Sequence, residues 1–179
     1  MRYRRLYMPG GSYFFTLVTE QRRKILVGDE TIAVLREAFR RVMVKRPFRI
    51  NAAVVMPDHL HCIWTMPAGD HDFSTRWRLI KTWFTKNCDE ALRGIPDTGR
   101  TKRGEQTVWQ HRYWEHALRN EEDFNHHVEY IHYNPVKHGY ARRPDDWRYS
   151  SFRHYVNKGI YAADWGAVTV DFPESVGQE

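Results

Sequence analysis

The sequence predicts an α+β fold in which an antiparallel sheet is covered by helices. Two segments carry apolar residues at helical spacing, and segments rich in aromatic and β-branched residues precede, separate and follow them. Proline and glycine residues mark the boundaries between these segments. In chain order the expected elements are a strand, a helix, two strands, a helix and a strand, which is the order of the split βαβ or ferredoxin-like unit.

The composition indicates one globular domain with a polyanionic partner. The chain has 179 residues, including seven Trp, ten Tyr and nine Phe, so it is long enough and apolar enough to bury a core. Its 28 Lys and Arg residues exceed its 22 Asp and Glu residues, which gives a net charge of +6 and a pI near 9.4. This excess favours nucleic acid as the partner, although many such charges belong to solvated helix faces.

The sequence also predicts a reducing compartment. Cys62 and Cys88 lie far apart in apolar patterns and have no Cys-x-x-Cys spacing, so we expect both to be reduced core residues. No apolar run reaches the roughly 18 residues that a membrane span needs, and residues 1–7 lack the apolar region of a signal peptide. We therefore expect a cytoplasmic protein with no membrane partner.

The first strand and the first helix are expected at 12–19 and 30–45. The strand is rich in aromatic and β-branched residues and follows a Gly-Gly pair, which permits a sharp turn. The helix has apolar residues at helical spacing, with Asp29 as its N-cap and Pro47 just beyond its end.

The next expected elements are strands at 48–56 and 59–66, a helix at 74–92 and a strand at 107–118. A tight turn at Pro57 and Asp58 joins the first two, because proline presets a turn's backbone angle and aspartate bonds to its own backbone. Ser74 is expected to cap the helix, and a Gly-rich basic loop separates that helix from the last strand.

The third strand carries the first functional signal. Side chains alternate along a strand, so His59 and His61 share one face while Leu60, Cys62 and Trp64 share the other. In a split βαβ unit the first and third strands are central and both helices cover one face, so the two histidines should look out from the opposite face. Their imidazoles could then bind one divalent metal ion, although a pair of surface histidines is the simpler alternative.

A further helix is expected from Asn120 to Pro135. Asn120 is a good N-cap, acidic residues in the first turn suit the helix dipole, and the proline should end the helix. Tyr130 and Asn134 lie one turn apart on a polar flank, together with His127. This helix could cover the open face of the sheet, although a polar flank beside an apolar stripe is typical of a solvated side.

Four segments together resemble a known family. They are His59-Leu60-His61, the Trp-Gln-His-Arg-Tyr-Trp-Glu-His run at 109–116, the Tyr-Ile-His-Tyr-Asn-Pro-Val-Lys-His-Gly run at 130–139 and the Trp-Arg-Tyr-Ser-Ser-Phe run at 147–152. In these segments the sequence closely resembles the REP-associated tyrosine transposases, which are single-tyrosine members of the HUH nuclease superfamily. The resemblance extends from Tyr3 to about Tyr155.

This resemblance implies an HUH-type ferredoxin-like sheet with an added C-terminal catalytic helix. Residues 1–156 would form one nuclease domain with a basic N-terminal arm, and residues 157–179 a C-terminal tail. The implied activity is that of a single-stranded DNA endonuclease and strand transferase, which acts on hairpins of repetitive extragenic palindromes (REPs) through a 5′-phosphotyrosine. Such a protein would be nucleoid-associated in a bacterial cytoplasm, and the REP-associated group resembles monomers.

The resemblance also implies roles for individual residues. His59 and His61 become metal ligands and Tyr130 becomes the nucleophile. Asn134 stands where insertion-sequence relatives place a Gln as third ligand, and its shorter amide still offers an oxygen. The expected ion is Mg²⁺, which is abundant, or Mn²⁺, which imidazole nitrogens suit better. Other tyrosines compete on sequence alone, but only Tyr130 stands one turn before Asn134.

Basic residues are expected to contact DNA. The N-terminal arm would read bases at the foot of a hairpin, while residues of the second helix and of the loop after it would contact phosphates. The DNA-binding residues predicted on this basis are Arg2, Tyr3, Arg4, Arg5, Arg76, Arg78, Lys81, Lys102 and Arg103.

The sequence leaves other functions open. An HUH replication initiator or relaxase would share the chemistry, although the chain is small and lacks a helicase-like region. A hairpin-binding protein with a vestigial metal site would bind DNA without cleaving it, and a hydrolase that uses water would cleave it without Tyr130. His127 and His132 are candidates for assisting proton transfer, with a surface histidine as the alternative for each.

Overall fold

The computed structural model describes residues 8–94, 107–173 and 176. The strands are β1 (Ser12–Val18), β2 (Arg49–Val55), β3 (His59–Thr65) and β4 (Trp114–Ala117). The helices are α1 (Asp29–Lys45), α2 (Phe73–Asn87), α4 (Glu121–Lys137) and α5 (Phe152–Asn157), with 3-10 turns at Glu20–Arg22, Glu90–Leu92 and Pro144–Asp146. None of the helices in these ranges combines the length and apolarity of a membrane-spanning helix.

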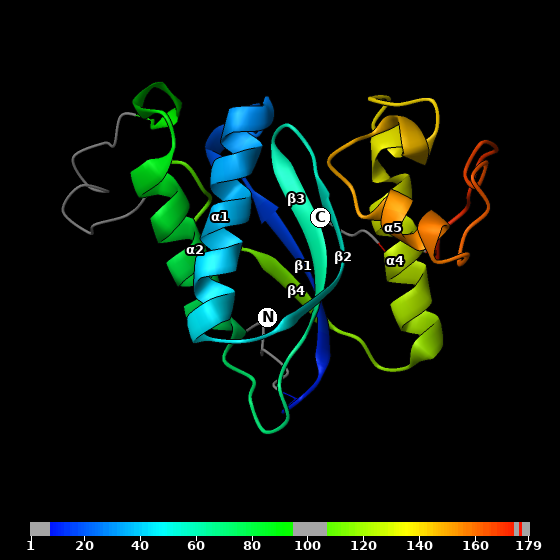
Figure 1. Ribbon diagram of the computed structural model, residues 1–179, viewed down its shortest axis with the longest axis horizontal. Coiled ribbons are helices and arrows are strands. Elements are labelled where there is room, and N and C mark those ends of the chain that lie inside the picture. The colour runs from blue at the N-terminus through cyan, green and yellow to red at the C-terminus, as the bar shows by residue number, and fades with distance from the viewer. Residues whose placement is uncertain (1–7, 95–106, 174–175, 177–179) are drawn as a thin grey trace.

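The four strands form one antiparallel sheet in the order β2-β3-β1-β4. Strands β1 and β3 are central, which confirms the predicted split βαβ topology. Helices α1 and α2 lie on one side of the sheet, and α4 and α5 lie on the other (Figure 1). The strand that carries the two histidines therefore lies in the middle of a three-layered structure.

Two apolar clusters lie on the two faces of the sheet, and the alternation along β3 divides its side chains between them. Leu60, Cys62 and Trp64 belong to the cluster under α1 and α2. Ile63 belongs to the other cluster, with Ile131 of α4. The predicted assignment of faces is confirmed, and α4 covers the face on which His59 and His61 were expected.

The two N-caps predicted in the first half of the chain are wrong by one or two residues. Helix α1 begins at Asp29 itself, after Gly28, whose φ of 79° suits a residue without a side chain. Helix α2 begins after Asp72, whose carboxylate accepts a hydrogen bond from the backbone N–H of Thr75. Asp72 satisfies a free N–H of the first turn in this way, so Ser74 lies inside the helix rather than before it.

The fourth strand is much shorter than the predicted 107–118. Thr16 pairs with Trp114, whereas Thr19 pairs with Trp109 in an isolated bridge. The three residue steps from Thr16 to Thr19 therefore lie opposite the five steps from Trp109 to Trp114. A regular antiparallel ladder pairs residues one to one, so the extra residues interrupt it. Lys81 of α2 donates hydrogen bonds to the carbonyl groups of Gln110 and His111 and so holds the part of the segment that leaves the ladder.

Helix α4 begins as predicted but extends beyond Pro135. The Asn120 side chain accepts from the backbone N–H of Asp123, which confirms the N-cap. The helix continues to Lys137, and the N–H of His138 still donates to the carbonyl of Asn134. The predicted end at Pro135 is therefore wrong, because a proline removes only its own donor while the groups around it keep their partners.

The described part of the C-terminal segment packs beside α4. Trp165 and Phe172 both contact the ring of Tyr133, and Phe172 also contacts Tyr130 with ring centroids 5.6 Å apart. The boundary expected between a domain that ends at residue 156 and a tail stays a prediction.

Candidate active site

The two histidines of β3 lie buried between the sheet and α4. His59 and His61 are 1% and 0% exposed, and their ring centroids are 4.9 Å apart. They stand side by side because residues two apart on a strand project from the same face. Buried imidazoles need polar partners, and each ring has one that fixes its orientation.

His59 is oriented by the turn residue before it. Its Nδ1 lies 2.7 Å from Oδ1 of Asp58, and the other carboxylate oxygen lies 3.5 Å from the Arg22 guanidinium. A carboxylate only accepts hydrogen bonds, so Nδ1 of His59 donates to Asp58, and Nε2 is the ring nitrogen that faces α4. A carboxylate behind a histidine is the usual way to orient a metal-binding imidazole.

His61 is held by the neighbouring central strand. Its Nδ1 lies 2.9 Å from the hydroxyl of Thr16, which is its cross-strand partner on β1. Its ring stacks on Phe14 with centroids 5.4 Å apart. Because Nδ1 is engaged by the hydroxyl, Nε2 is the nitrogen through which His61 could bind an ion.

Asn134 of α4 completes the group. Its Oδ1 lies 3.2 Å from Nε2 of His59, and the side chain is completely buried. The amide nitrogen of Asn134 has no hydrogen-bond partner among the described residues. The distance between Oδ1 of Asn134 and Nε2 of His59 suits two ligands of one cation, because neighbouring ligands of an octahedral ion with bonds of about 2.1 Å lie about 3.0 Å apart.

Tyr130 lies one helical turn before Asn134. It is 1% exposed, and its ring centroid is 5.4 Å from that of His61. Its hydroxyl accepts a hydrogen bond of 2.9 Å from Nζ of Lys137, which also lies 4.5 Å from the centre of the ring. The side chain of Phe172 packs edge to face against the same ring.

The structure thus brings together the four residues that the sequence singled out, two from β3 and two from α4.

The sequence and the fold also match known proteins. The family model described as "Transposase IS200 like" matches residues 8–134. The sequence is 46% identical to the REP-associated tyrosine transposase of Escherichia coli K12 over 170 residues, which cover 95% of this chain and 93% of that protein. The chain belongs to the REP-associated tyrosine transposases.

Other members of the family support the assignment. A putative REP-associated tyrosine transposase of Haemophilus influenzae is 40% identical over 164 residues, covering 92% of both chains. A solved structure of a REP-associated tyrosine transposase bound to a REP hairpin superposes with a TM-score of 0.78 at 43% identity, covering 96% of this chain and 94% of that one. The chain is therefore a member of a family of DNA-processing enzymes.

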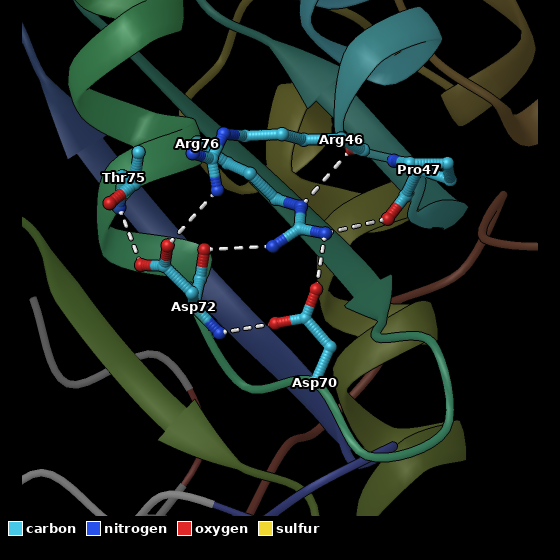
Figure 2. A network of polar contacts seen from close by, with 6 residues as sticks. All are labelled: Arg46, Pro47, Asp70, Asp72, Thr75 and Arg76. Carbon is cyan, nitrogen blue, oxygen red and sulfur yellow. Dashed lines mark hydrogen bonds and ion pairs between the residues drawn. The ribbon is translucent and has the colours of Figure 1, made fainter.

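The predicted DNA contact of Arg76 is contradicted by its position. Arg76 is 2% exposed, and four protein oxygens accept hydrogen bonds from its guanidinium. It donates to the backbone carbonyl groups of Arg46, Pro47 and Asp72 and to the Asp70 carboxylate, whose oxygen is 2.6 Å away (Figure 2). Arg76 therefore joins the start of α2 to the connection between α1 and β2, and no phosphate can reach it.

The other predicted DNA-binding residues differ in position. Arg78 is exposed on α2, as a phosphate contact requires. Lys81 is largely buried beside the carbonyl groups that it holds before β4, and burial lowers its pKa to about 8. The remaining predicted residues, which are Arg2, Tyr3, Arg4, Arg5, Lys102 and Arg103, lie outside the described residues.

The two histidines considered for proton transfer have other surroundings. His132 lies among Tyr155, Tyr161 and Phe152, with Nε2 2.8 Å from the hydroxyl of Ser151. Burial lowers its pKa to about 3, so it is a neutral core residue. His127 is buried against Phe14 and belongs to a cluster with His116 and Asp123.

Sequence reasoning missed three residues that position the site. Asp58 was recognised only as a turn residue, although its place directly before a candidate ligand is a usable signal. Thr16 could be found only from the register of β1 and β3. Lys137 was overlooked because the helix was expected to end at Pro135, whereas a continuous helix places it two turns after Tyr130.

Proposed function

We propose that this chain is a metal-dependent single-stranded DNA endonuclease and strand transferase that acts on REP hairpins through a 5′-phosphotyrosine. The observation that carries the proposal is the convergence of Tyr130 with His59, His61 and Asn134 between β3 and α4. A buried tyrosine with a cationic donor on its hydroxyl, next to three oriented donor groups, is an unusual arrangement for a purely structural core.

The metal ligands in this proposal are Nε2 of His59, Nε2 of His61 and Oδ1 of Asn134. Asp58 and Thr16 hold the Nδ1 atoms of the two imidazoles, so Nε2 of each ring is the nitrogen that can take the ion. Two nitrogen donors and one oxygen donor suit Mn²⁺ better than Mg²⁺. When bound, such an ion polarises the scissile phosphate and orients it through coordination positions that the protein leaves open.

Tyr130 is the nucleophile in the proposed reaction. Its oxygen forms a bond to phosphorus while the bond between phosphorus and the 3′ oxygen breaks in line with it. The phenol proton passes to solvent and the leaving 3′ oxygen takes up a proton, so the products are a 5′-phosphotyrosine and a free 3′-OH. The phosphodiester bond energy is retained in the new ester, and a 3′-OH can therefore reverse the step without ATP.

Lys137 supports both directions of this reaction. Its ammonium lies 2.9 Å from the Tyr130 hydroxyl and stabilises negative charge on that oxygen. The charge develops as the proton leaves before attack, and it develops again when the tyrosine is the leaving group during rejoining. Lys137 is therefore a positioning and charge-stabilising group that touches the reacting atom.

Access to Tyr130 requires a rearrangement. The tyrosine is 1% exposed and Phe172 packs against its ring. A phosphodiester can reach the hydroxyl only when groups around Tyr130 move, and the segment that carries Phe172 is the candidate for this movement. Binding of DNA and displacement of this segment are thus coupled in the proposed mechanism.

The proposed partner is a single-stranded DNA hairpin. The transposase in the solved structure, at 43% identity, is bound to a REP hairpin. The net charge of +6 and the exposed Arg78 suit a polyanion, and the predicted DNA contacts in the N-terminal arm and in the loop near residue 102 extend the proposal to Arg2, Tyr3, Arg4, Arg5, Lys102 and Arg103. A cytoplasmic, nucleoid-associated location and a monomeric state stay predictions.

End-labelled single-stranded DNA with a candidate palindrome tests the function. Wild type, Tyr130→Phe and His59→Gln are incubated with it in Mn²⁺ or Mg²⁺ and run on a denaturing gel, with a native gel in parallel. The proposal expects a metal-dependent covalent adduct with wild type and none with either variant. Hairpin binding without cleavage by wild type would favour the binding protein, and cleavage by Tyr130→Phe would favour hydrolysis by water.

A further inference from the structure

A second group of metal-binding side chains lies at the junction of β4 and α4. His116 projects from β4, while Asp123 and His127 lie one turn apart on α4. The candidate ligand atoms of these three residues lie within 4.8 Å of one another. Nε2 of His116 is 2.9 and 3.2 Å from the two oxygens of Asp123, and Nδ1 of His127 is 3.1 Å from one of them.

We propose that His116, Asp123 and His127 form a second metal site, for a transition ion of the Zn²⁺ type, that is separate from the site at His59 and His61. Two imidazoles and one carboxylate are a common three-residue ligand set for such ions. The ligand atoms of a tetrahedral ion with bonds of about 2.1 Å lie about 3.4 Å apart. The separations of Asp123 from His116 and from His127 are a few tenths of an ångström shorter than this.

A cavity beside the cluster provides room for further ligands. Its volume is about 310 Å³, and His116 and Asp123 line it. His126 and Glu122 also line this cavity, so a side chain or a water molecule can complete the coordination. Arg119 also lines this cavity.

Hydrogen bonding alone explains only part of this cluster. Asp123 accepts hydrogen bonds from the backbone N–H of Arg119 and from His116, so its carboxylate has hydrogen-bond partners without an ion. His127 places Nδ1 2.7 Å from the backbone carbonyl of Asp123. Its Nε2 has no hydrogen-bond partner among the described residues, although the side chain is 1% exposed. Because a carbonyl only accepts, Nδ1 carries the ring proton here, and an ion bound at Nδ1 would replace this hydrogen bond and move the ring proton to Nε2.

An ion at this position would brace the helix that carries the tyrosine. It would join β4 to the first two turns of α4, and His127 lies one turn before Tyr130. Phe14 contacts both residues, with ring centroids 4.8 Å from His127 and 6.1 Å from Tyr130. The second ion would therefore stabilise the packing of α4 on the sheet.

Metal binding by the purified full chain tests this proposal, with Zn²⁺ as the probe. Zinc bound per chain is measured by equilibrium dialysis for wild type, His116→Gln and Asp123→Asn. Gln can still donate to Asp123, and Asn can still accept from the Arg119 N–H, so both variants keep the hydrogen bonds of the cluster. His154→Gln, which changes an exposed histidine of α5, is the matched control.

We expect both cluster variants to bind one ion fewer than wild type and the control to bind as many. His59→Gln with His61→Gln should also lose one ion and keep the one at the cluster. Visible absorption of Co²⁺ bound to that double variant should disappear on adding His116→Gln. The proposal is overturned when the cluster variants bind as much Zn²⁺ as wild type or when this Co²⁺ absorption survives the added substitution.

Discussion

The ammonium of Lys137 donates a 2.9 Å hydrogen bond to the hydroxyl of Tyr130, two turns earlier on the same helix. This contact exists because α4 continues through Pro135, which keeps both side chains on one face. The lysine also lies 4.5 Å from the centre of the tyrosine ring. A cation is thus fixed at the oxygen on which negative charge must develop. The imidazole of His61 packs edge to face against the ring of the same tyrosine.

Replacing Lys137 should slow the chemical step. Lys137→Met keeps most of the side-chain length but removes the charge, so we expect the cleavage rate at saturating DNA to fall about tenfold or more, with little change in hairpin affinity. Lys137→Arg should keep most of the rate. Single-turnover cleavage of a labelled hairpin measures both effects, with Lys158→Met, an exposed lysine after α5, as the control. An unchanged rate in Lys137→Met would remove the lysine from the mechanism.

Asp58 should control metal affinity through His59. Asp58→Asn keeps an oxygen that accepts from Nδ1 of His59 but loses the negative charge behind the imidazole. We expect the Mn²⁺ concentration needed for half-maximal cleavage to rise about 10- to 100-fold. Asp164→Asn, at an exposed position, is the control. Equal Mn²⁺ dependence in Asp58→Asn and wild type would show that the carboxylate only shapes the turn.

Arg76 and Arg78 form a matched pair with opposite expected phenotypes. Arg76→Met leaves carbonyl groups of Arg46, Pro47 and Asp72 without their donor, so the free energy of unfolding should fall by about 2–4 kcal/mol. Arg78→Met should change it by less than about 0.5 kcal/mol, because the side chain is exposed. Urea unfolding measures the difference between the two variants.

The same pair distinguishes a structural arginine from a DNA contact. Arg78→Met should weaken hairpin binding and reduce the dependence of log affinity on log salt by about 0.7 to 0.9. Arg76→Met, measured at a temperature at which it remains folded, should leave the salt dependence unchanged. The assignment is wrong if Arg76→Met reduces the salt dependence and Arg78→Met does not.

His132 should make the fold sensitive to acid. Burial lowers its pKa to about 3 from the ordinary 6.5, so below pH 6.5 the unfolded chain binds a proton that the folded chain does not. The unfolded state is then favoured, and stability falls as the pH drops from 6.5 toward 3. In His132→Asn, the amide of the new side chain can still donate to the Ser151 hydroxyl, but it does not titrate.

The comparison of His132→Asn with wild type isolates this effect. From urea unfolding at about pH 7 and about pH 5, wild type should lose more stability than His132→Asn, whatever the stability of the variant at neutral pH. His154→Asn, at an exposed position of α5, should lose as much as wild type. Equal losses in wild type and His132→Asn would show that the histidine is not buried as a neutral group.

The topology and the faces on which the main site residues lie were accessible from the sequence because they follow local periodicity, whereas the roles of these residues came from the resemblance to a known family. Alternation along β3 separates His59 and His61 from Leu60 and Cys62, and the structure places the pairs on opposite faces. The spacing of Tyr130 and Asn134 gives one helical turn. These inferences need only the period of each element and the order of the elements.

Other features depend on contacts between distant segments, which no local pattern encodes. Arg76 was expected on the surface with Arg78, but its partners come from the connection between α1 and β2. The shortness of β4 follows from a surplus of residues opposite β1, which becomes visible only when the pairing is known. The position of Lys137 beside Tyr130 depends on whether Pro135 ends the helix, and the helix continues to Lys137.

The most direct test is to identify the residue that becomes linked to DNA. After reaction with a REP hairpin and Mn²⁺, nuclease and trypsin digestion should leave a nucleotide phosphate on the peptide 120–137, which contains both Tyr130 and Tyr133. Fragmentation in the mass spectrometer should place the modification on Tyr130, and Tyr130→Phe should abolish it. A phosphate on Tyr133, or cleaved DNA with no modified peptide, would contradict the proposed mechanism.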